Sequence, residues 1–367
     1  MGANLQGADI RDPLAQRTGT GPTSVTAARS NPALLSRSVT VAYQRPPLAA
    51  LGLNRVAITL LAIELSLLLL SIALYPLLGL SYVWQSAWRV VGVPAALMLL
   101  WSYLAWEPGR SPWDWAVAER ILALSVFCIV MMIQPQLQYV GLALNRPLID
   151  DWLVATDSLM GVRLVEWTAW TRQHRPLLVT LVVAYTSFGM QLCVPLVALG
   201  IRSLKDRAAL WEYLFHLTAC VTFTMLVFAF FPSNSSSTLY DFEPVIGQHA
   251  VVRHIAEFRS GHMTRVDVKT IEGLISFPSF HVAGALIVTW TFRHRRWMMW
   301  PLAVLNALLV AATLLLGIHY AIDIVAGVAV FMASVWVYRK AGFAGSIQAS
   351  ASEGFASRAH HHIDPSR

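Results

Sequence analysis

Two histidines and one aspartate in the C-terminal third of the sequence have types and a spacing that suit acid–base and nucleophilic chemistry. His281 follows Pro278 and Ser279 at the start of a long apolar run, and His319 lies four residues before Asp323. On a helix, two residues four apart share one face and lie one turn from each other. A carboxylate bonded to one imidazole nitrogen fixes the tautomer and raises the basicity of the other nitrogen, which can then attack phosphorus.

The cluster around His281 supplies what such an attack would still need. A second histidine can protonate the leaving oxygen as a general acid. Pro278 and Ser279 predict a turn just before a helix, and exposed N–H groups at a helix N-terminus bind phosphate oxygens. The sequence therefore predicts half of a phosphoryl-transfer site at residues 278–281 and the other half at residues 319–323.

Each motif alone has a simpler interpretation. A single histidine at a membrane boundary is usually an interfacial polar residue, and a single His-x-x-x-Asp is more often a helix ion pair or a cap. Ionisable residues inside membrane segments are costly, however, and indicate function by default. The occurrence of both motifs in order, at the same predicted membrane surface, favours the catalytic interpretation.

The composition places these residues in an integral membrane protein. Of the 367 residues, 56% are hydrophobic and 13% are charged, whereas average soluble domains carry about 25% charged residues. The mean hydropathy is +0.56. Lys and Arg fall mostly between apolar runs, so membrane topology accounts for the net charge of +7 and nucleic acid is not an expected partner. The sequence does not indicate an oligomeric state.

The apolar runs predict an all-α polytopic fold with about eight transmembrane helices. A spanning helix needs about 20 apolar residues, and the candidates are 56–80, 88–106, 121–143, 176–201, 209–231, 279–293, 297–317 and 320–338. The segment 147–172 has apolar residues at helical spacing among charges, which predicts one or two amphipathic helices at the interface.

The basic residues predict the orientation, because cytoplasmic loops carry an excess of Lys and Arg. The N-terminal tail and every second short loop are basic: Arg110 and Arg120, then Arg202, Lys205 and Arg207, then Arg293, Arg295 and Arg296, then Arg339 and Lys340. Both termini are then cytoplasmic and 232–278 is extracytoplasmic. This topology places His281, His319 and Asp323 at one extracytoplasmic surface.

Four segments follow from these patterns. We expect a disordered cytoplasmic tail at 1–55, N-terminal transmembrane helices at 56–143, a phosphatase- or phosphotransferase-like membrane core at 144–338, and a second disordered cytoplasmic tail at 339–367. The catalytic part is expected to be a six-helix bundle preceded by two extra spans.

Two short stretches resemble a known family. "FPSFH" at 277–281 and "GIHYAID" at 317–323 resemble the second and third motifs of the type 2 phosphatidic acid phosphatase superfamily, Pro-Ser-Gly-His and Ser-Arg-x5-His-x3-Asp. Phe280 stands in place of the Gly, Ala312 and Thr313 stand in place of Ser-Arg, and no Lys-x6-Arg-Pro motif is found. These departures are similar to the inositol phosphorylceramide synthase-like branch and its bacterial relatives. The resemblance covers roughly 145–338.

The resemblance implies a role for each matching residue. His319 corresponds to the nucleophile, Asp323 to its orienting partner and His281 to the acid for the leaving group, with Ser279 among the substrate-binding residues. The family works without a metal or other cofactor, and this sequence has no acidic or Cys cluster: Cys128, Cys193 and Cys220 lie singly in apolar runs.

The missing motif arginine leaves the phosphate without its usual partner. The loop stretch "EFRSGHMTRVDVK" offers Arg259, Arg265 and Lys269 as substitutes. Arg259 is the first choice, because its Arg-Ser-Gly context resembles a loop in the bacterial relatives. Ser and Asn in "FFPSNSSSTLY" at 230–240 can also donate to a head group.

The expected function is therefore a metal-independent phosphatase or phosphotransferase that acts on a lipid phosphate ester through a phosphohistidine, in a bacterial inner membrane with the site facing the periplasm. The alternative is a transporter or channel whose His and Asp groups relay protons. Against it, the sequence shows no inverted repeat and no charge at a membrane midplane. An inactive lipid-binding member is a third reading, and the intact His-His-Asp set argues against it.

The topology can be tested by labelling single cysteines with an impermeant thiol reagent, in a variant whose three native Cys are replaced by Ser. We expect a cysteine at 262 to react on intact cells, and cysteines at 204 and 294 to react only after permeabilisation. Labelling at 204 without labelling at 262 would overturn both the orientation and the predicted location of the site.

Overall fold

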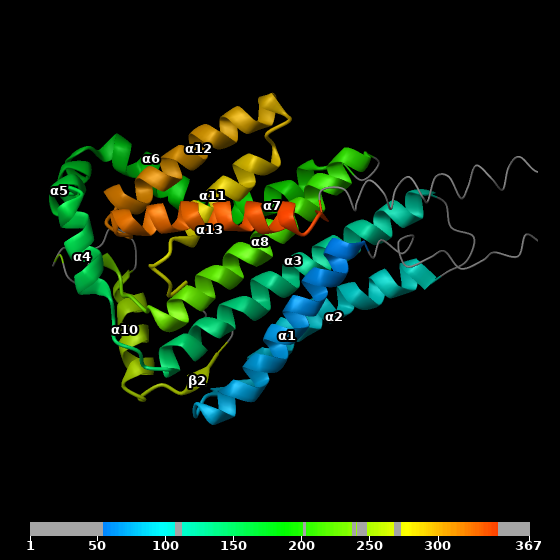
Figure 1. Cartoon of the computed structure of the whole chain (residues 1–367), viewed down its shortest axis with the longest axis horizontal. Coiled ribbons are helices and arrows are strands. Elements are labelled where there is room, and N and C mark those ends of the chain that lie inside the picture. The colour runs from blue at the N-terminus through cyan, green and yellow to red at the C-terminus, as the bar shows by residue number, and fades with distance from the viewer. Residues whose placement is uncertain are drawn as a thin grey trace, which may run out of the picture. The chain divides into compact units, whose positions relative to one another are not determined.

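The protein is almost entirely helical where the structure, a computed structural model, describes it (Figure 1). It describes residues 54–106, 112–200, 203–236, 240, 248–267 and 273–343. All of these belong to one unit, Gln44–Arg367. Nearly all of the two predicted tails, together with Lys269, fall outside the described residues.

The helices follow the chain in the order α1 Arg55–Leu77, α2 Trp84–Trp106, α3 Pro112–Ala143, α4 Asp150–Leu159, α5 Leu164–Gln173, α6 Arg175–Thr186, α7 Phe188–Ala198, α8 Leu204–Phe230, α10 Gln248–Arg259, α11 Phe280–Thr291, α12 Arg296–Leu315 and α13 Ala321–Lys340. Two short strands, β1 Ser81–Tyr82 and β2 Arg265–Val266, pair in parallel and tie the α1–α2 connection to the segment after α10.

The predicted all-α polytopic membrane fold is confirmed. Among the described residues, five helices are long and apolar enough to span a membrane: α1, α3, α8, α12 and α13. The predicted fourth span is instead a broken pair, α6 and α7, bent by 52° at Ser187. The predicted second and sixth spans coincide with shorter apolar helices, Val91–Trp106 within α2 and Phe280–Thr291. Six of the eight expected spans therefore meet the length criterion if the bent pair counts as one.

The boundaries of the two predicted tails need small corrections. α1 already begins at Arg55, because the Asn54 side chain accepts the Ala57 N–H at 2.8 Å and caps the helix. At the other end α13 continues through Lys340, so helix replaces the first two residues of the predicted tail.

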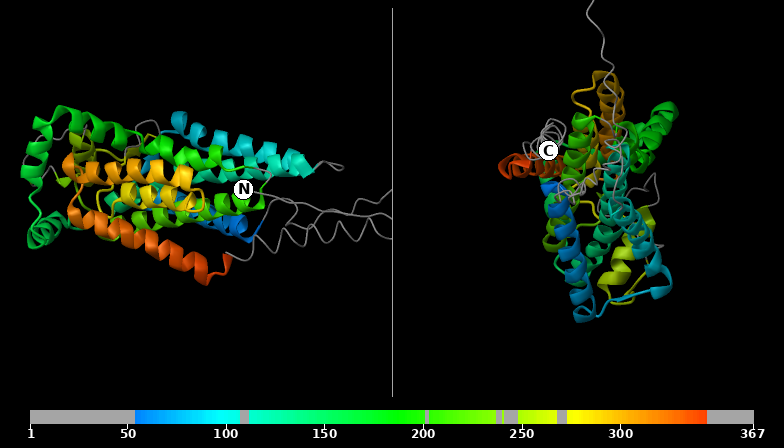
Figure 2. Two further views of the ribbon diagram at one scale, coloured as in Figure 1. Left: turned by 90° about the horizontal axis from the view of Figure 1, so that it is seen from above. Right: turned by 90° about the vertical axis from the view of Figure 1, so that its right-hand side faces the viewer.

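The predicted interfacial segment forms two helices, α4 and α5. Figure 1 shows them at the left-hand end of the bundle, transverse to the long helices. α10 and the start of α13 lie at this same end, and the further views in Figure 2 show the same arrangement. The segments that carry the candidate site residues therefore meet at one end of the bundle.

Helix α11 is the central element of the packing. It contacts α7, α8, α12 and α13, and seven of its twelve residues are buried. A helix that is apolar all round is expected to be buried in this way. α11 begins at Phe280, directly after Ser279, and includes His281. The four neighbouring helices therefore fix the positions of Ser279 and His281.

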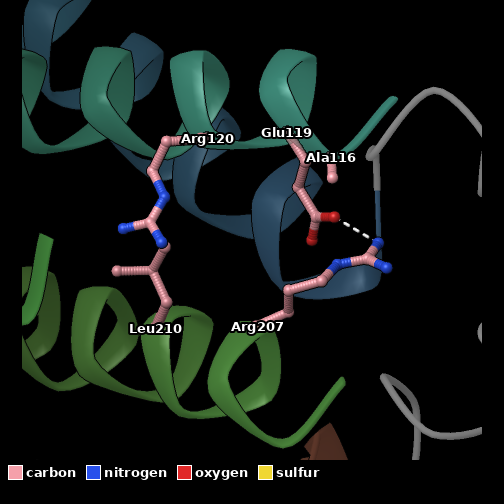
Figure 3. Close-up of a pocket in the computed structure, with 5 residues that line it drawn as sticks. All are labelled: Ala116, Glu119, Arg120, Arg207 and Leu210. Atoms are coloured by element: carbon pink, nitrogen blue, oxygen red, sulfur yellow. Dashed lines mark ion pairs between the residues drawn. The ribbon is translucent and has the colours of Figure 1, made fainter. Parts of the chain in front are cut away.

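Ion pairs join the helices at the opposite end of the bundle. Glu119 of α3 pairs with Arg207 of α8, beside Arg120 (Figure 3). Glu119 also accepts the indole N–H of Trp211 at 2.8 Å, and Arg120 donates to the carbonyl oxygens of Leu196 and Leu199, which end α7. These charged residues lie at helix ends next to the loops that the sequence predicts to be cytoplasmic. They link α3, α7 and α8.

One charge inside a span was not expected. Glu64 lies near the middle of α1 and is buried, and it accepts a hydrogen bond from the Gln134 amide of α3. Thr222 of α8 in turn donates to Gln134 at 3.3 Å. The expectation of no charge in the middle of a span is therefore wrong. Gln134 satisfies Glu64 Oε1, whereas Oε2 is buried and has no hydrogen-bond partner among the described residues.

Gly327 permits a close approach of α13 to the start of α11. A Cβ at this position would lie 2.5 Å from the Ser279 carbonyl oxygen and 3.0 Å from Val282 Cβ. We expect Gly327→Ala to destabilise the fold by about 1–3 kcal/mol, as overpacking in a filled core does. The matched control is Gly189→Ala on α7, where an added Cβ meets nothing within 4 Å. Thermal unfolding in detergent measures both, and equal melting temperatures would contradict the close packing.

Candidate active site

His319 and Asp323 meet at the N-terminus of α13, in a geometry that differs from the predicted one. His319 lies in the connection between α12 and α13, two residues before the helix begins at Ala321. Asp323 is in the first turn, and its side chain turns back to accept the Tyr320 N–H at 3.0 Å. The expectation that both residues lie on one helical face is therefore wrong. The pair forms because the Asp323 side chain caps the N-terminus of α13 and, from there, reaches the His319 ring.

The Asp323 carboxylate is fully buried and holds His319 in one orientation. Its Oδ2 lies 3.1 Å from His319 Nδ1 and accepts the Ser276 hydroxyl at 2.8 Å. When Nδ1–H donates to this carboxylate oxygen, Nε2 keeps its lone pair. The loop itself is fixed by the His319 backbone N–H, which donates to the Thr313 carbonyl oxygen at 2.9 Å.

The free edge of the His319 ring faces the start of α11. His319 Nε2 lies 3.3 Å from Ser279 Oγ, and the ring centroids of His319 and His281 are 5.7 Å apart at 66°. Ser279 caps α11 by accepting the Val282 N–H at 3.4 Å, and its own N–H donates to the Asp323 carbonyl oxygen at 3.2 Å. The structure thus brings together four predicted site residues: His319, Asp323, His281 and Ser279.

His281 is held by aromatic rings at the break between α6 and α7. Its ring stacks on Tyr185 at 4.5 Å between centroids and lies 4.7 Å from Phe188. These two residues flank Ser187, where the helix pair bends. Tyr185 lies within the predicted fourth span, 176–201, and nothing in the apolar pattern of that span reveals the bend that turns its ring toward His281.

Arg259 is the predicted phosphate ligand that the structure places near this group. It is the last residue of α10, and its Nη1 is buried and has no hydrogen-bond partner among the described residues. Burial lowers the pKa of its guanidinium, whereas the charge of Asp150 raises it. Asp150 accepts the hydroxyl of Tyr320, the residue after His319, at 2.9 Å. Asp150 therefore interacts electrostatically with Arg259 and is hydrogen-bonded to the loop that carries the candidate nucleophile.

The structure does not join the other described basic candidate to the site. Arg265 is exposed in β2, and no hydrogen bond or ion pair among the described residues links it to the histidine pair. Lys269 lies outside the described residues. Both remain predictions as substrate-binding residues.

Several side chains that shape the site were not singled out from the sequence. Ser276 donates to Asp323, and Asp150 and Asp157 of α4 accept hydrogen bonds from the α13 end of the site. The spacing of Asp150 and Asp157 could have pointed to them, because two acids seven residues apart in an amphipathic segment lie on one helical face. The partners of these acids are distant in sequence and no local pattern reveals them.

The serine-rich stretch after α8 is used mainly to hold loops. Ser233 accepts the Phe277 N–H at 3.1 Å, and Ser236 donates to the Gly317 carbonyl oxygen at 2.9 Å. Both side chains are buried. Asn234 differs, because its side-chain Oδ1 is buried and has no hydrogen-bond partner. Among the described residues of this stretch, Asn234 therefore has an unused acceptor oxygen, which cannot itself donate to a head group.

The assembled groups match the needs of a phosphoryl or acyl transfer: an oriented imidazole whose Nε2 faces the Ser279 hydroxyl, a second imidazole across from it, and a helix N-terminus beside both. Within the part of the chain that the structure describes, no group of three or more His, Cys, Asp or Glu side chains is arranged to hold a metal ion.

Comparison with known proteins adds one finding. A family model described as "PAP2 superfamily" matches residues 151–337, slightly more than half of the chain. No curated protein and no solved structure matches the chain. The matched range contains His281, His319, Asp323 and Arg259.

Proposed function

The chain belongs to the PAP2 superfamily, and from this membership we propose that it is a metal-independent phosphatase or phosphotransferase that acts on a lipid phosphate ester. The superfamily contains phosphatases and phosphotransferases. The apolar helices of this chain, which are long enough to span a membrane, fit a lipid substrate. The observation that carries the proposal is the contact of His319 with Asp323, which leaves the other ring nitrogen facing Ser279 and His281. Membership does not favour the transporter or channel alternative.

In the first proposed step, the lone pair of His319 Nε2 attacks phosphorus. An N–P bond forms, and the bond from phosphorus to the leaving oxygen breaks. His281, protonated at this point, gives its proton to that oxygen, so that a neutral alcohol departs. Asp323 stabilises the positive charge that develops on the His319 ring.

In the second proposed step, water or an alcohol attacks the phosphohistidine. His281, now neutral, takes the proton of the attacking oxygen, the N–P bond breaks, and His319 regains its lone pair. Water as the acceptor gives a phosphatase, and an alcohol gives a transferase. The inositol phosphorylceramide synthase-like branch suggested by Phe280 would use an alcohol.

The phosphate is proposed to lie between the α11 N-terminus and Arg259. Ser279, the N-cap residue of α11, faces His319, and a helix N-terminus favours an anion. Arg259 offers a guanidinium nitrogen that is buried and unpartnered. Thr313, which stands where relatives carry an arginine, uses its carbonyl oxygen to fix the His319 loop. Arg265 and Lys269 are proposed to attract the anionic substrate from the surface.

Two features support a lipid as the substrate. An open, apolar cavity of about 360 Å³ is lined by Trp167, Trp170 and Leu315. Leu315 ends α12, four residues before His319. In addition, Trp152 of α4 and Trp170 of α5 are exposed on the helices predicted to lie at the interface, where tryptophan is enriched. We propose that the core at 144–338 presents its site at the extracytoplasmic surface, toward the periplasm of a bacterial inner membrane.

A substrate panel tests the proposed activity. Purified protein is incubated with labelled lipid phosphates and phospholipids, with and without added inositol or ceramide. Release of inorganic phosphate indicates a phosphatase, and transfer of the labelled group to the added alcohol indicates a transferase. Folded protein that turns over no member of the panel would contradict the proposal.

The three central residues should differ in their effects. We expect His319→Ala to abolish turnover because it removes the attacking atom. His281→Ala should lower kcat about 10²–10⁴-fold, the range for one general acid, and less for substrates with good leaving groups. Asp323→Asn should lower kcat while the protein stays folded. Combined variants should lose less than the sum, because the residues act as a unit.

The matched control for these substitutions is His262→Ala, which removes an exposed histidine from the loop after α10. Its activity should equal that of the wild type. If folded His319→Ala kept activity within a few-fold of wild type, the contact with Asp323 would be only a structural ion pair.

Chelation provides an independent test. We expect activity to survive dialysis against a strong chelator, because the proposed steps use histidine and helix N–H groups and require no metal ligand. Activity is measured before and after dialysis, and again after adding single divalent metals. Complete loss that one metal restores would overturn the mechanism.

A further inference from the structure

Helix α4 carries two buried carboxylates that contact the loops of the active site. Asp150 and Asp157 are 5% and 0% exposed, so neither can act as a free surface charge. A buried carboxylate is costly unless hydrogen bonds satisfy it. Both lie on one face of the helix, two turns apart. Their partners therefore show what α4 holds.

Asp157 caps the helix that carries Asp323. Its two oxygens accept the backbone N–H groups of Ala321 and Ile322 at 2.9 and 3.1 Å. These N–H groups belong to the first turn of α13 and have no partner within the helix. A carboxylate from α4 thus supplies the cap, which is favourable at the positive end of a helix.

Asp150 connects three separate parts of the site. Its oxygens accept the Asn234 N–H at 3.0 and 2.9 Å, and Oδ1 accepts the Tyr320 hydroxyl at 2.9 Å. Its charge also acts on Arg259, whose Nη1 is buried without a hydrogen-bond partner. One side chain therefore contacts the loop after α8 and the residue next to His319, and interacts electrostatically with the proposed phosphate ligand.

We infer that Asp150 is a positioning residue that aligns the nucleophile loop, through Tyr320, with the phosphate-binding side of the site, through Asn234. The inference rests on the proposed function of the site. Asp150 itself does not contact substrate, because its oxygens are occupied by Tyr320 and Asn234. On the phosphate-binding side, the Arg259 nitrogen that has no hydrogen-bond partner among the described residues is left for a phosphate oxygen.

The nucleophile side and the phosphate-binding side of the site predict different kinetic effects. Tyr320→Phe removes the hydroxyl that Asp150 holds and should lower kcat with little change in KM, because it releases only the nucleophile loop. Arg259→Gln should mainly raise KM. Asp150→Ala should do both, and a loss of about 10- to 100-fold in kcat/KM fits a displacement of about 1 Å in a reacting group. Asp150→Asn retains an oxygen acceptor and should recover most of the lost kcat.

Coupling between the residues separates positioning from general destabilisation. Once Asp150 is Ala, adding Tyr320→Phe should lower kcat no further, because the bond that it removes is already absent. Loss of folded protein would instead reduce kcat in every variant with KM unchanged. The matched control is Asp151→Asn, which alters the exposed neighbouring carboxylate of the same helix and should match the wild type.

A second measurement does not depend on turnover. Hydrogen–deuterium exchange of full-length protein in detergent should be faster in the peptide covering 316–322 for Asp150→Ala, and unchanged for Asp151→Asn. Unchanged exchange, wild-type kcat and KM in folded Asp150→Ala, or an additive Tyr320→Phe effect would each overturn the inference. A wild type that turns over no phosphate ester would refute the proposed function, while the exchange result would still decide whether Asp150 orders this loop.

Discussion

The buried carboxylate of Asp323 is the interaction on which the rest of the site depends. One oxygen, Oδ2, meets the His319 ring, the Ser276 hydroxyl and the Tyr320 N–H. Hydrogen bonds of this kind offset the cost of burying a carboxylate. The other oxygen, Oδ1, is buried and has no hydrogen-bond partner among the described residues. Because the three partners of Oδ2 come from the α12–α13 connection and from the segment before α11, these contacts fix the relative positions of both halves of the site.

The helices are arranged so that this contact can form at one end of the bundle. α11 packs against four helices. α13 approaches the start of α11 so closely that there is no room for a side chain at Gly327. α4 crosses the same end and caps α13 through Asp157. The site is therefore built where short connections meet, while the long helices supply a rigid frame. Functional groups on loops held by a rigid scaffold are a common arrangement.

The sequence was sufficient for the parts of this account that depend on local patterns. Apolar runs located the spanning helices, and the amphipathic pattern located α4 and α5. The spacing of His281, His319 and Asp323 pointed to groups that the structure brings together. The bend at Ser187, the loop position of His319 and the burial of Glu64 against Gln134 were not predictable in this way. The burial of Glu64 and the link from Asp150 to Tyr320 depend on partners far along the chain, and periodicity within one segment carries no information about such partners.

The central claim is that His319 becomes covalently phosphorylated, and trapping the intermediate tests it most directly. Wild-type protein is mixed with a substrate labelled with ³²P in its phosphate, quenched in alkali within the first turnover, digested and analysed by mass spectrometry. The account predicts an acid-labile, alkali-stable phosphate on the peptide that contains His319, absent from His319→Ala and retained in His281→Ala with a substrate whose leaving group needs no proton. Turnover without label on this peptide, or the same label in His319→Ala, would contradict it.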